Sequence, residues 1–323
     1  MSTDIIFLIV GNQRLGTGHI YRSIIYRKEL TVLGFKCTTY YLPGDDLVKK
    51  IYEQYNMSAE QLDYLNSNII KDSYSNVYIL DILDTSKEFV CMLKEKNKVI
   101  SFEDLGPGSE QADLVINALY KQKEIKANHY FGHNYVELRE EFDNIFYKVK
   151  RKVKNVLITF GGTDPTNSTL LVVSSIYDYC ISNSININIV NGPGYQYLNS
   201  LDSFPKINIR CNIDNMAKTM AQNDIAFCSA GRTIYELASI GVPSIVVTHN
   251  ERENNHLFAT QEYGFFNLGL SKFLEKKRVL KTYIKLVEDY QLRMHISNIM
   301  LENNLKEGKK RVLKLILKVI NEK

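Results

Sequence analysis

Four polar stretches of this chain follow directly on apolar runs and hold the side chains best suited to chemistry. The first, residues 16–22, reads GTGHIYR. Glycines let a backbone approach a ligand closely, and a helix N-terminus favours negative charge. Because that end of a helix disfavours a protonated imidazole, we expect His19 to be available as a general base, with Arg22 one turn later on the same face. A turn with a capping histidine is the structural alternative.

The second and third stretches are candidates for phosphate and ribose binding. Residues 161–165 read GGTDP, which is typical of a helix start with free N–H groups. Residues 229–233 offer hydroxyl and N–H groups to phosphate, and the carboxylate of Glu236, one turn further, could accept hydrogen bonds from a ribose diol. A plain turn and a dipole-favoured glutamate are the structural alternatives. No stretch matches GxGxxG or a P-loop.

The fourth stretch, residues 249–256, reads HNERENNH and follows the apolar run SIVVT. Amides and carboxylates in that place suit the hydroxyl groups of a sugar, and a solvated loop is the structural alternative. His249 and His256 could suggest a metal, but no third ligand presents itself. We therefore expect no metal site, and the sequence points to no other cofactor.

The elements that must position these stretches alternate between strand and helix patterns. In the first half, strands are predicted at 4–10, 36–42, 76–83, 98–102 and 113–117, with a helix from the GTGH turn to Gly34, two helical stretches before residue 76, and a short helix near 86–97. In the second half, strands are predicted at 155–160, 185–190, 207–210, 223–229 and 242–248, with helices near 166–182, after Gly194, near 214–222 and near 231–240. Such alternation predicts parallel βαβ units with both sheet faces covered.

The length of 323 residues predicts two domains, because a single core stops growing before that size. The basic stretch KVKRKVKN at 148–155 is interpreted as a solvated linker between them. We therefore predict an α/β protein with Rossmann-like domains at 1–150 and 151–304, followed by a basic helix at 305–323. Their glycine turns should face a cleft, since ligands of open α/β sheets bind beyond the carboxyl ends of the strands.

Composition favours a soluble, cytoplasmic protein. Hydrophobic residues make up 45% and charged residues 24% of the chain, and no apolar run approaches the ~20 residues that span a bilayer. The apolar opening residues lack a basic n-region and a cleavage site, so they are interpreted as a strand rather than a signal peptide. The five cysteines form no CxxC pair and predict neither a disulfide framework nor a zinc site.

The net charge of +4 comes from the C-terminus. Residues 305–323 hold seven basic and two acidic side chains, a local +5, so the rest of the chain is about −1. No RNA-binding motif accompanies this tail, and we expect no nucleic acid partner. The last helix has apolar residues opposite its lysines, which allows weak membrane-surface contact, but we favour packing against the first domain.

Taken together and in order, the stretches resemble the GT-B nucleotide-sugar enzymes with two Rossmann domains. The greatest likeness is to the family of the UDP-sugar hydrolase of pseudaminic acid biosynthesis (UDP-2,4-diacetamido-2,4,6-trideoxy-beta-L-altropyranose hydrolase) and to spore-coat-polysaccharide-type proteins. The matching residues are Gly16–Arg22, Phe131–Tyr135 with Leu138 and Arg139, Phe160–Pro165, Ala230–Glu236, and Asn250–Glu253 with His256. The second domain also resembles, more distantly, the peptidoglycan N-acetylglucosaminyltransferases, through Asn212–Met216, Ser229–Glu236 and the pair Asn254 and Asn255.

The resemblance implies a role for each motif. His19 would be the base that activates water, Glu236 would hold the ribose, and the backbone near Ile213 would read the uracil. The glycine turns would surround the diphosphate, and the asparagine pair would touch the sugar. The residues expected to bind substrate are Gly16, Gly18, Arg22, Tyr135, Gly161, Gly162, Thr163, Ile213, Met216, Ser229, Gly231, Thr233, Glu236, Asn250, Asn254, Asn255 and His256.

The resemblance thus implies hydrolysis of a UDP-activated amino-deoxy sugar, which serves nonulosonic acid or surface polysaccharide synthesis. The chain departs from the hydrolase pattern where it reads NERENNH in place of the usual Asn-Gln. Two alternatives therefore stay open: a glycosyltransferase with the same UDP-sugar donor, and a nucleotide-sugar-binding protein without catalysis. The sequence leaves the sugar and the oligomeric state open as well.

Overall fold

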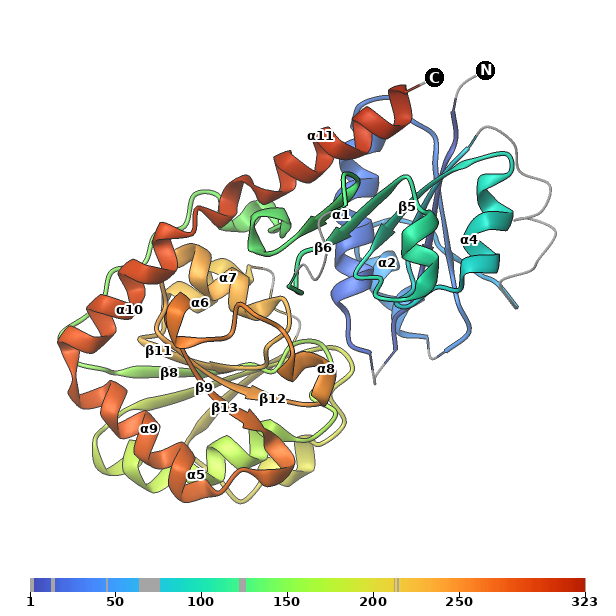
Figure 1. Cartoon of the computed structure of the whole chain (residues 1–323). Coiled ribbons are helices and arrows are strands. Elements are labelled where there is room, and N and C mark those ends of the chain that lie inside the picture. The colour runs from blue at the N-terminus through green and yellow to red at the C-terminus, as the bar shows by residue number, and fades with distance from the viewer. Residues whose placement is uncertain are drawn as a thin grey trace. The chain divides into compact units, whose positions relative to one another are not determined.

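The computed structural model describes residues 3–12, 15–44, 46–63, 76–121, 126–211, 213 and 215–322. Contacts divide the chain into two units (Figure 1). Unit 1 comprises Met1–Glu137 and Glu307–Lys323, and unit 2 comprises Leu138–Lys306. Each unit is built on one sheet in which all paired strands are parallel, so the predicted α/β class is confirmed.

Unit 1 holds a seven-stranded sheet in the order β3-β2-β1-β4-β5-β6-β7. All five predicted strands are present, whereas β3 and β7 are short additions at the two edges. One of the two helical stretches predicted before residue 76 is α2, and the other falls on residues 64–75, outside the described residues. The elements are β1 (Ile5–Ile9), α1 (Gly18–Val32), β2 (Cys37–Tyr41), α2 (Leu47–Gln54), β3 (Glu60–Gln61), β4 (Val77–Asp81), α4 (Lys87–Lys94), β5 (Lys98–Phe102), η1 (Pro107–Gln111), β6 (Leu114–Asn117), β7 (His129–Phe131), η2 (His133–Tyr135) and α11 (Gly308–Asn321).

The core of unit 1 explains why β1 is apolar at every position. Side chains alternate between the two faces of a strand, so a strand that is covered on both faces has no solvent side. Phe7 and its odd-numbered neighbours pack with α1, α2 and α11, whereas Ile6 and Leu8 pack with α4. The strand β1 is therefore buried along its whole length.

The last helix, α11, packs on unit 1 through its apolar face. Val312, Ile316 and Val319 recur every three or four residues and are buried in the same core as β1. The helix begins at Gly308, where an added Cβ would lie 1.8 Å from the backbone oxygen of Val136, so no larger residue fits without movement. Lys310, Lys314 and Lys318 are exposed, whereas Lys309 forms an ion pair with Glu29 at 2.6 Å and Arg311 donates to the carbonyl oxygen of Asn134 at 3.1 Å. In the described part of the chain, no helix has the length and apolar character to cross a membrane.

Unit 2 holds a six-stranded sheet in the order β10-β9-β8-β11-β12-β13. The predicted strands and helices are found with small changes at their ends, and the short helix expected after Gly194 is a single 3-10 turn, η4. The strand β13 and the helices α8, α9 and α10 were not predicted. The elements are η3 (Glu140–Phe142), β8 (Asn155–Ile158), α5 (Ser168–Ser182), β9 (Asn186–Asn191), η4 (Leu198–Leu201), β10 (Ile207–Cys211), α6 (Met216–Ala221), β11 (Ile225–Cys228), α7 (Thr233–Ile240), β12 (Ser244–Thr248), α8 (Glu251–Asn254), η5 (Gln261–Tyr263), β13 (Phe265–Leu270), η6 (Ser271–Phe273), α9 (Lys276–Glu288), α10 (Tyr290–Glu302) and, at the junction with unit 1, η7 (Leu305–Glu307).

The basic stretch at 148–155 is not a solvated linker, and that prediction was wrong. Val149 and Val153 are buried, and the buried Asp224 accepts hydrogen bonds from the backbone nitrogens of Lys154 (2.8 Å) and Asn155 (2.9 Å). The division of the chain falls between Glu137 and Leu138, earlier than the predicted position near 150. The segment from Leu138 onward therefore belongs to unit 2, because its backbone is bonded there.

Arg293 is the second anchor of this segment. Its side chain is fully buried, and its guanidinium donates to the carbonyl oxygens of Lys150 and Arg151, both at 2.9 Å. It also donates to the carbonyl oxygens of Leu286 (2.5 Å) and Val287 (2.8 Å) at the end of α9. One arginine thus supplies donors to four carbonyls from two segments that are distant in sequence.

We predict that Arg293→Met lowers the free energy of unfolding by about 2–4 kcal/mol, because buried carbonyl groups lose their donors. Chemical denaturation measures this change. Arg278→Met, at an exposed position of α9, is the matched control and should change stability by less than about 0.5 kcal/mol. Equal effects of the two substitutions would contradict the anchoring role.

Candidate functional site

The first predicted turn leads from β1 into α1 in unit 1. Gly16 adopts a φ of 79°, a conformation that favours glycine, and its nitrogen donates to the carbonyl oxygen of Asn12 at 2.9 Å. Gly18 is the first residue of α1, so His19 and Arg22 lie in its first and second turns. Both side chains are almost completely buried. The predicted placement of His19 at the helix start is confirmed.

Two acidic residues meet these side chains at the carboxyl ends of neighbouring strands. Asp81 is the last residue of β4, where it lies beside Ile9 of β1, and Glu103 follows the last residue of β5. Nδ1 of His19 is hydrogen-bonded to Oδ1 of Asp81. The sequence reasoning did not single out Asp81 or Glu103. The signal for both was an acidic residue at the end of a buried strand.

Arg22 holds this cluster together. Its Nε donates to Asp81 Oδ2 at 2.7 Å, its Nη2 to Asp81 Oδ1 at 2.8 Å, and its Nη1 to Glu103 Oε1 at 3.0 Å. Glu103 also accepts from the backbone nitrogens of Ala118 (3.1 Å) and Leu119 (3.4 Å). A two-pronged contact of this kind fixes a carboxylate in position as well as in charge.

The carboxyl groups of Asp81 and Glu103 differ in how readily they ionise. Burial opposes ionisation of Asp81, but the charges and hydrogen bonds of Arg22 and His19 outweigh it and lower the pKa of Asp81 to about 2. Burial raises the pKa of Glu103, only partly countered by Arg22. Since Asp81 stays ionised, it accepts a hydrogen bond from the N–H group at His19 Nδ1. The contacts of the imidazole found among the described residues all involve Nδ1, which leaves Nε2 as the nitrogen that can take up a proton.

Tyr135, the other candidate of unit 1, lies in η2 and packs edge-to-face against Tyr130 with ring centres 5.2 Å apart. It also packs against the unit 1 core. Its described contacts are structural, and a role in substrate binding stays a prediction.

In unit 2, the GGTDP turn differs from its prediction. The helix α5 begins only at Ser168, and Asp164 accepts from the backbone nitrogens of Ser168 (2.8 Å) and Thr169 (2.9 Å). The expected free N–H groups of this helix start are thus bound by its own aspartate. Gly161 has a φ of 75°, and the carbonyl oxygen of Gly162 accepts from Gly194. The buried Thr163 completes the turn.

The third and fourth stretches lie together at the carboxyl ends of β11 and β12. Nδ1 of His256 donates to the carbonyl oxygen of Ala230 at 2.7 Å, between the predicted residues Ser229 and Gly231. Glu253 accepts from the backbone nitrogen of His249 at 2.9 Å. Burial lowers the pKa of His256 to about 4 and raises the pKa of Glu253. His256 is therefore a neutral imidazole at neutral pH.

His249 joins this group to the GGTDP turn, which the sequence did not predict. Its Nδ1 lies 2.8 Å from the hydroxyl oxygen of Thr166 and 3.8 Å from Asp164 Oδ1. Asn250 caps α8, because its side-chain oxygen accepts from the backbone nitrogen of Glu253 at 2.9 Å. Asn254 and Asn255 end α8 with exposed side chains. A contact of these two with a sugar stays a prediction.

The nucleoside candidates gather around α6 and α7. Thr233 is the first residue of α7 and is buried, and Glu236 lies in the first turn of that helix. Met216 is the first residue of α6, and Ile213 is half-buried just before it. Asn212 and Asp214, which belong to the same motif, lie outside the described residues. Glu236 Oε1 accepts from two nitrogens of Arg139, a residue absent from the predicted site.

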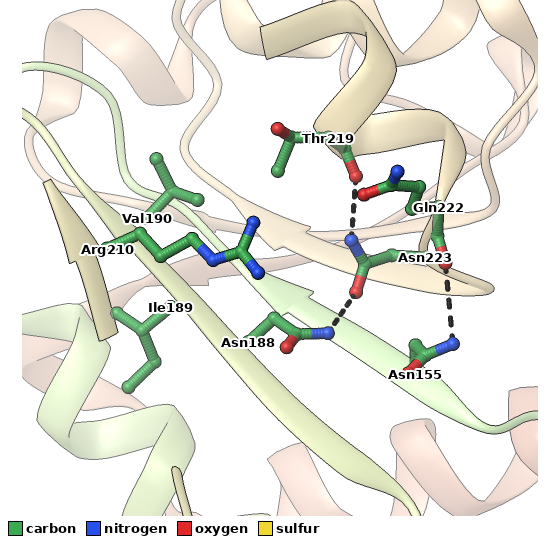
Figure 2. A pocket seen from close by; sticks show the side chains of 8 residues that line it. All are labelled: Asn155, Asn188, Ile189, Val190, Arg210, Thr219, Gln222 and Asn223. Carbon is green, nitrogen blue, oxygen red and sulfur yellow. Dashed lines mark hydrogen bonds between the residues drawn. The ribbon is translucent and has the colours of Figure 1, made fainter. Parts of the chain in front are cut away.

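A separate pocket of about 360 Å³ opens in unit 2 beside α6 (Figure 2). It contains none of the predicted site residues. Its asparagines are bonded to neighbours: Asn188 Nδ2 donates to Asn223 Oδ1 at 2.8 Å, and Asn223 Nδ2 donates to the carbonyl oxygen of Thr219 at 2.8 Å (Figure 2). The lining residues are Asn155, Asn188, Ile189, Val190, Arg210, Thr219, Gln222 and Asn223. Among the described residues, no group of three or more His, Cys, Asp or Glu side chains is arranged to hold a metal ion.

We predict that the buried His256 makes stability fall with acidity. The pKa of His256 is lowered from the ordinary 6.5 to about 4 in the folded protein, so the unfolded chain takes up the proton first. The free energy of unfolding should thus decrease by roughly 1 kcal/mol per pH unit between pH of about 6.5 and 4. Denaturation of wild type and His256→Asn at several pH values measures this, because only their difference isolates one group. The exposed His295→Asn is the control, and a difference that is independent of pH would contradict the prediction.

Comparison with known proteins identifies the family. The glycosyltransferase family 28 C-terminal domain matches residues 107–316. The chain is 33% identical over 272 residues to protein MJ1062 of Methanocaldococcus jannaschii; the match covers 75% of this chain and 54% of that protein, so the chain spans about half of its length.

Two relatives carry functional names. The chain is 27% identical over 245 residues to the UDP-2,4-diacetamido-2,4,6-trideoxy-beta-L-altropyranose hydrolase of Campylobacter jejuni, covering 72% of this chain and 86% of that enzyme. It is 22% identical over 307 residues to the spore coat polysaccharide biosynthesis protein SpsG of Bacillus subtilis, covering 88% and 89%. The expected likeness to both is confirmed, as a distant homology.

Among solved structures, MurG of Acinetobacter baumannii resembles the chain with a TM-score of 0.62 and 16% identity, covering 98% of this chain and 99% of that one. This likeness shows the fold, so the predicted GT-B class is confirmed. The domain match extends over more than half of the sequence. The chain is therefore a member of the glycosyltransferase family 28 C-terminal domain family.

Proposed function

We propose that this protein hydrolyses a UDP-activated amino-deoxy sugar and releases UDP, as a step towards nonulosonic acid or surface polysaccharide synthesis. The observation that carries the proposal is the buried pair of His19 and Asp81, with Arg22 bonded to the same carboxylate. This is the arrangement of a general base whose tautomer and orientation are set by a carboxylate. The likeness to a UDP-sugar hydrolase supports the choice of substrate class.

The proposed reaction uses His19 Nε2 as the base. Water attacks the anomeric carbon while its proton passes to Nε2, and the bond from that carbon to the phosphate oxygen breaks. UDP leaves with the bonding electron pair, and the sugar keeps the hydroxyl group derived from water. Asp81 accepts a hydrogen bond from the N–H group at Nδ1 throughout and stabilises the imidazolium that forms.

Unit 2 is proposed to hold the nucleotide. The turn from Ser229 to Thr233 precedes α7, and the amides at a helix N-terminus favour the negative charge of a diphosphate. Glu236 is proposed to accept the ribose hydroxyls, and the backbone at Ile213 with Met216 to contact the base. Gly161 and Gly162 are proposed to lie near the diphosphate as well, although the start of α5 is already capped by Asp164.

Glycosyl transfer is the second candidate, and the match to a glycosyltransferase domain favours it. The donor site and leaving group would be the same, but an acceptor hydroxyl would replace water. A measurement of UDP release without any acceptor separates the two reactions. Tight UDP binding with no release from a panel of UDP-sugars, with or without acceptors, would instead indicate a binding protein.

We predict that His19→Asn lowers the rate of UDP release by about 10²–10⁴, because general-base assistance is lost. UDP affinity should stay within about threefold of wild type, since the nucleotide contacts are assigned to other residues. A coupled UDP-release assay and calorimetry measure the two quantities. His295→Asn is the control, and near-full turnover of His19→Asn would rule out the base role.

We predict that UDP raises the thermal midpoint of the protein, because a ligand that binds only the folded state stabilises it by mass action. Glu236→Ala should weaken UDP binding by roughly 1–3 kcal/mol, the range for hydrogen bonds to a charged group. Glu262→Ala, at an exposed position, is the control. A midpoint shift with CDP or GDP but not with UDP would overturn the assignment of the base.

A further inference from the structure

One arginine contacts the candidate ribose carboxylate of unit 2. Arg139 donates through Nε (3.1 Å) and Nη2 (3.0 Å) to the same oxygen, Oε1, of Glu236. The two residues are 97 positions apart in sequence. The Glu236 side chain is 13% exposed and the Arg139 side chain 24%, so the pair is largely shielded from water. Shielding strengthens such a contact relative to one on the surface.

The same guanidinium reaches the start of α6. Nη1 of Arg139 forms an ion pair with Oε1 of Glu141 at 2.9 Å, and Glu141 Oε2 accepts from the backbone nitrogen of Met216 at 3.3 Å. The guanidinium also lies over the ring of Phe142, 5.5 Å from its centre. Arg139 thus links Glu236 of α7 to the first residue of α6, and both ends of this link are candidate nucleoside contacts.

The geometry leaves one carboxylate oxygen for a ligand. The contacts of the Glu236 carboxylate that the structure describes all involve Oε1. Among the described residues, Oε2 accepts no hydrogen bond from the protein. Two donors on one oxygen hold Oε1 in place and so limit the positions that Oε2 can take. A fixed acceptor binds a hydroxyl more tightly than a mobile one, because less conformational freedom is lost on binding.

We propose that Arg139 is a positioning residue for ribose recognition: it orients Glu236 so that Oε2 accepts a hydrogen bond from the ribose 2′-hydroxyl. The inference rests on the proposed binding of UDP by unit 2. It makes Arg139 a determinant of preference for ribonucleotides, because a buried acceptor left unpaired disfavours the 2′-deoxy compound. Arg139 itself touches no part of the nucleotide in this account.

The test compares the dissociation constants of UDP and 2′-deoxy-UDP by calorimetry. Wild type should prefer UDP by about 10–100-fold, the range expected for a hydrogen bond to a charged group. Arg139→Met should reduce this preference to about threefold or less while affinity for 2′-deoxy-UDP changes little. Arg139→Lys keeps the charge but loses the two-pronged contact, so its preference should be intermediate. Arg278→Met is the matched control and should keep the wild-type preference.

The double variant Arg139→Met with Glu236→Gln provides a second readout. If Arg139 acts through Glu236, the double variant should lose no more preference than Glu236→Gln alone. An unchanged preference in Arg139→Met, or in Arg139→Lys should the methionine variant fail to fold, would overturn the positioning role. Wild type that binds UDP without preferring it over 2′-deoxy-UDP would overturn this inference alone. Wild type that binds no uridine nucleotide would overturn the proposed function together with it.

Discussion

The buried contact between Arg22 and Asp81 is the interaction on which the candidate active site depends. A guanidinium out of water needs carboxylates or several carbonyl oxygens to bind its N–H groups, and where the partners are carboxylates, removal of one leaves a costly unpaired charge. Arg22 therefore requires both Asp81 and Glu103, which hold the ends of β4 and β5 next to the start of α1. His19 is hydrogen-bonded to the same aspartate. The ion pair of Arg22 and Asp81, which the folded structure requires, therefore also orients the His19 ring.

Unit 2 uses its polar groups differently. Asp164 binds the first amides of α5, Asn250 caps α8, and His256 donates to the backbone of the turn before α7. These bonds satisfy groups that would otherwise be open at helix ends and turns. Asn250 and His256, which the sequence suggested as ligand contacts, form hydrogen bonds that fix the shape of these turns. The shaped turns then present backbone groups and a few side chains, such as Glu236.

Three arginines illustrate how the same side chain serves structure or a site. Arg293 gives its donors to backbone carbonyls and stabilises unit 2, with no titratable partner in those bonds. Arg22 and Arg139 instead give two donors each to one carboxyl group, Asp81 and Glu236. A planar guanidinium suits this task because its N–H groups form a rigid fork in one plane. Orientation of a functional group by a rigid partner is what a preorganised site requires.

The sequence by itself determined the local features of this protein. The apolar runs and glycine turns predicted the strands, the helix starts and the place of His19, because strand burial and turn geometry depend on neighbouring residues. Contacts between distant segments required the tertiary structure. Asp81 lies 62 positions from His19 and Arg139 lies 97 positions from Glu236, so no local pattern reports either pair. The basic stretch at 148–155 was interpreted as a linker because its charges can be read from the sequence. The hydrogen bonds of its backbone with Asp224 and Arg293 form only when the chain folds, so the sequence did not reveal them.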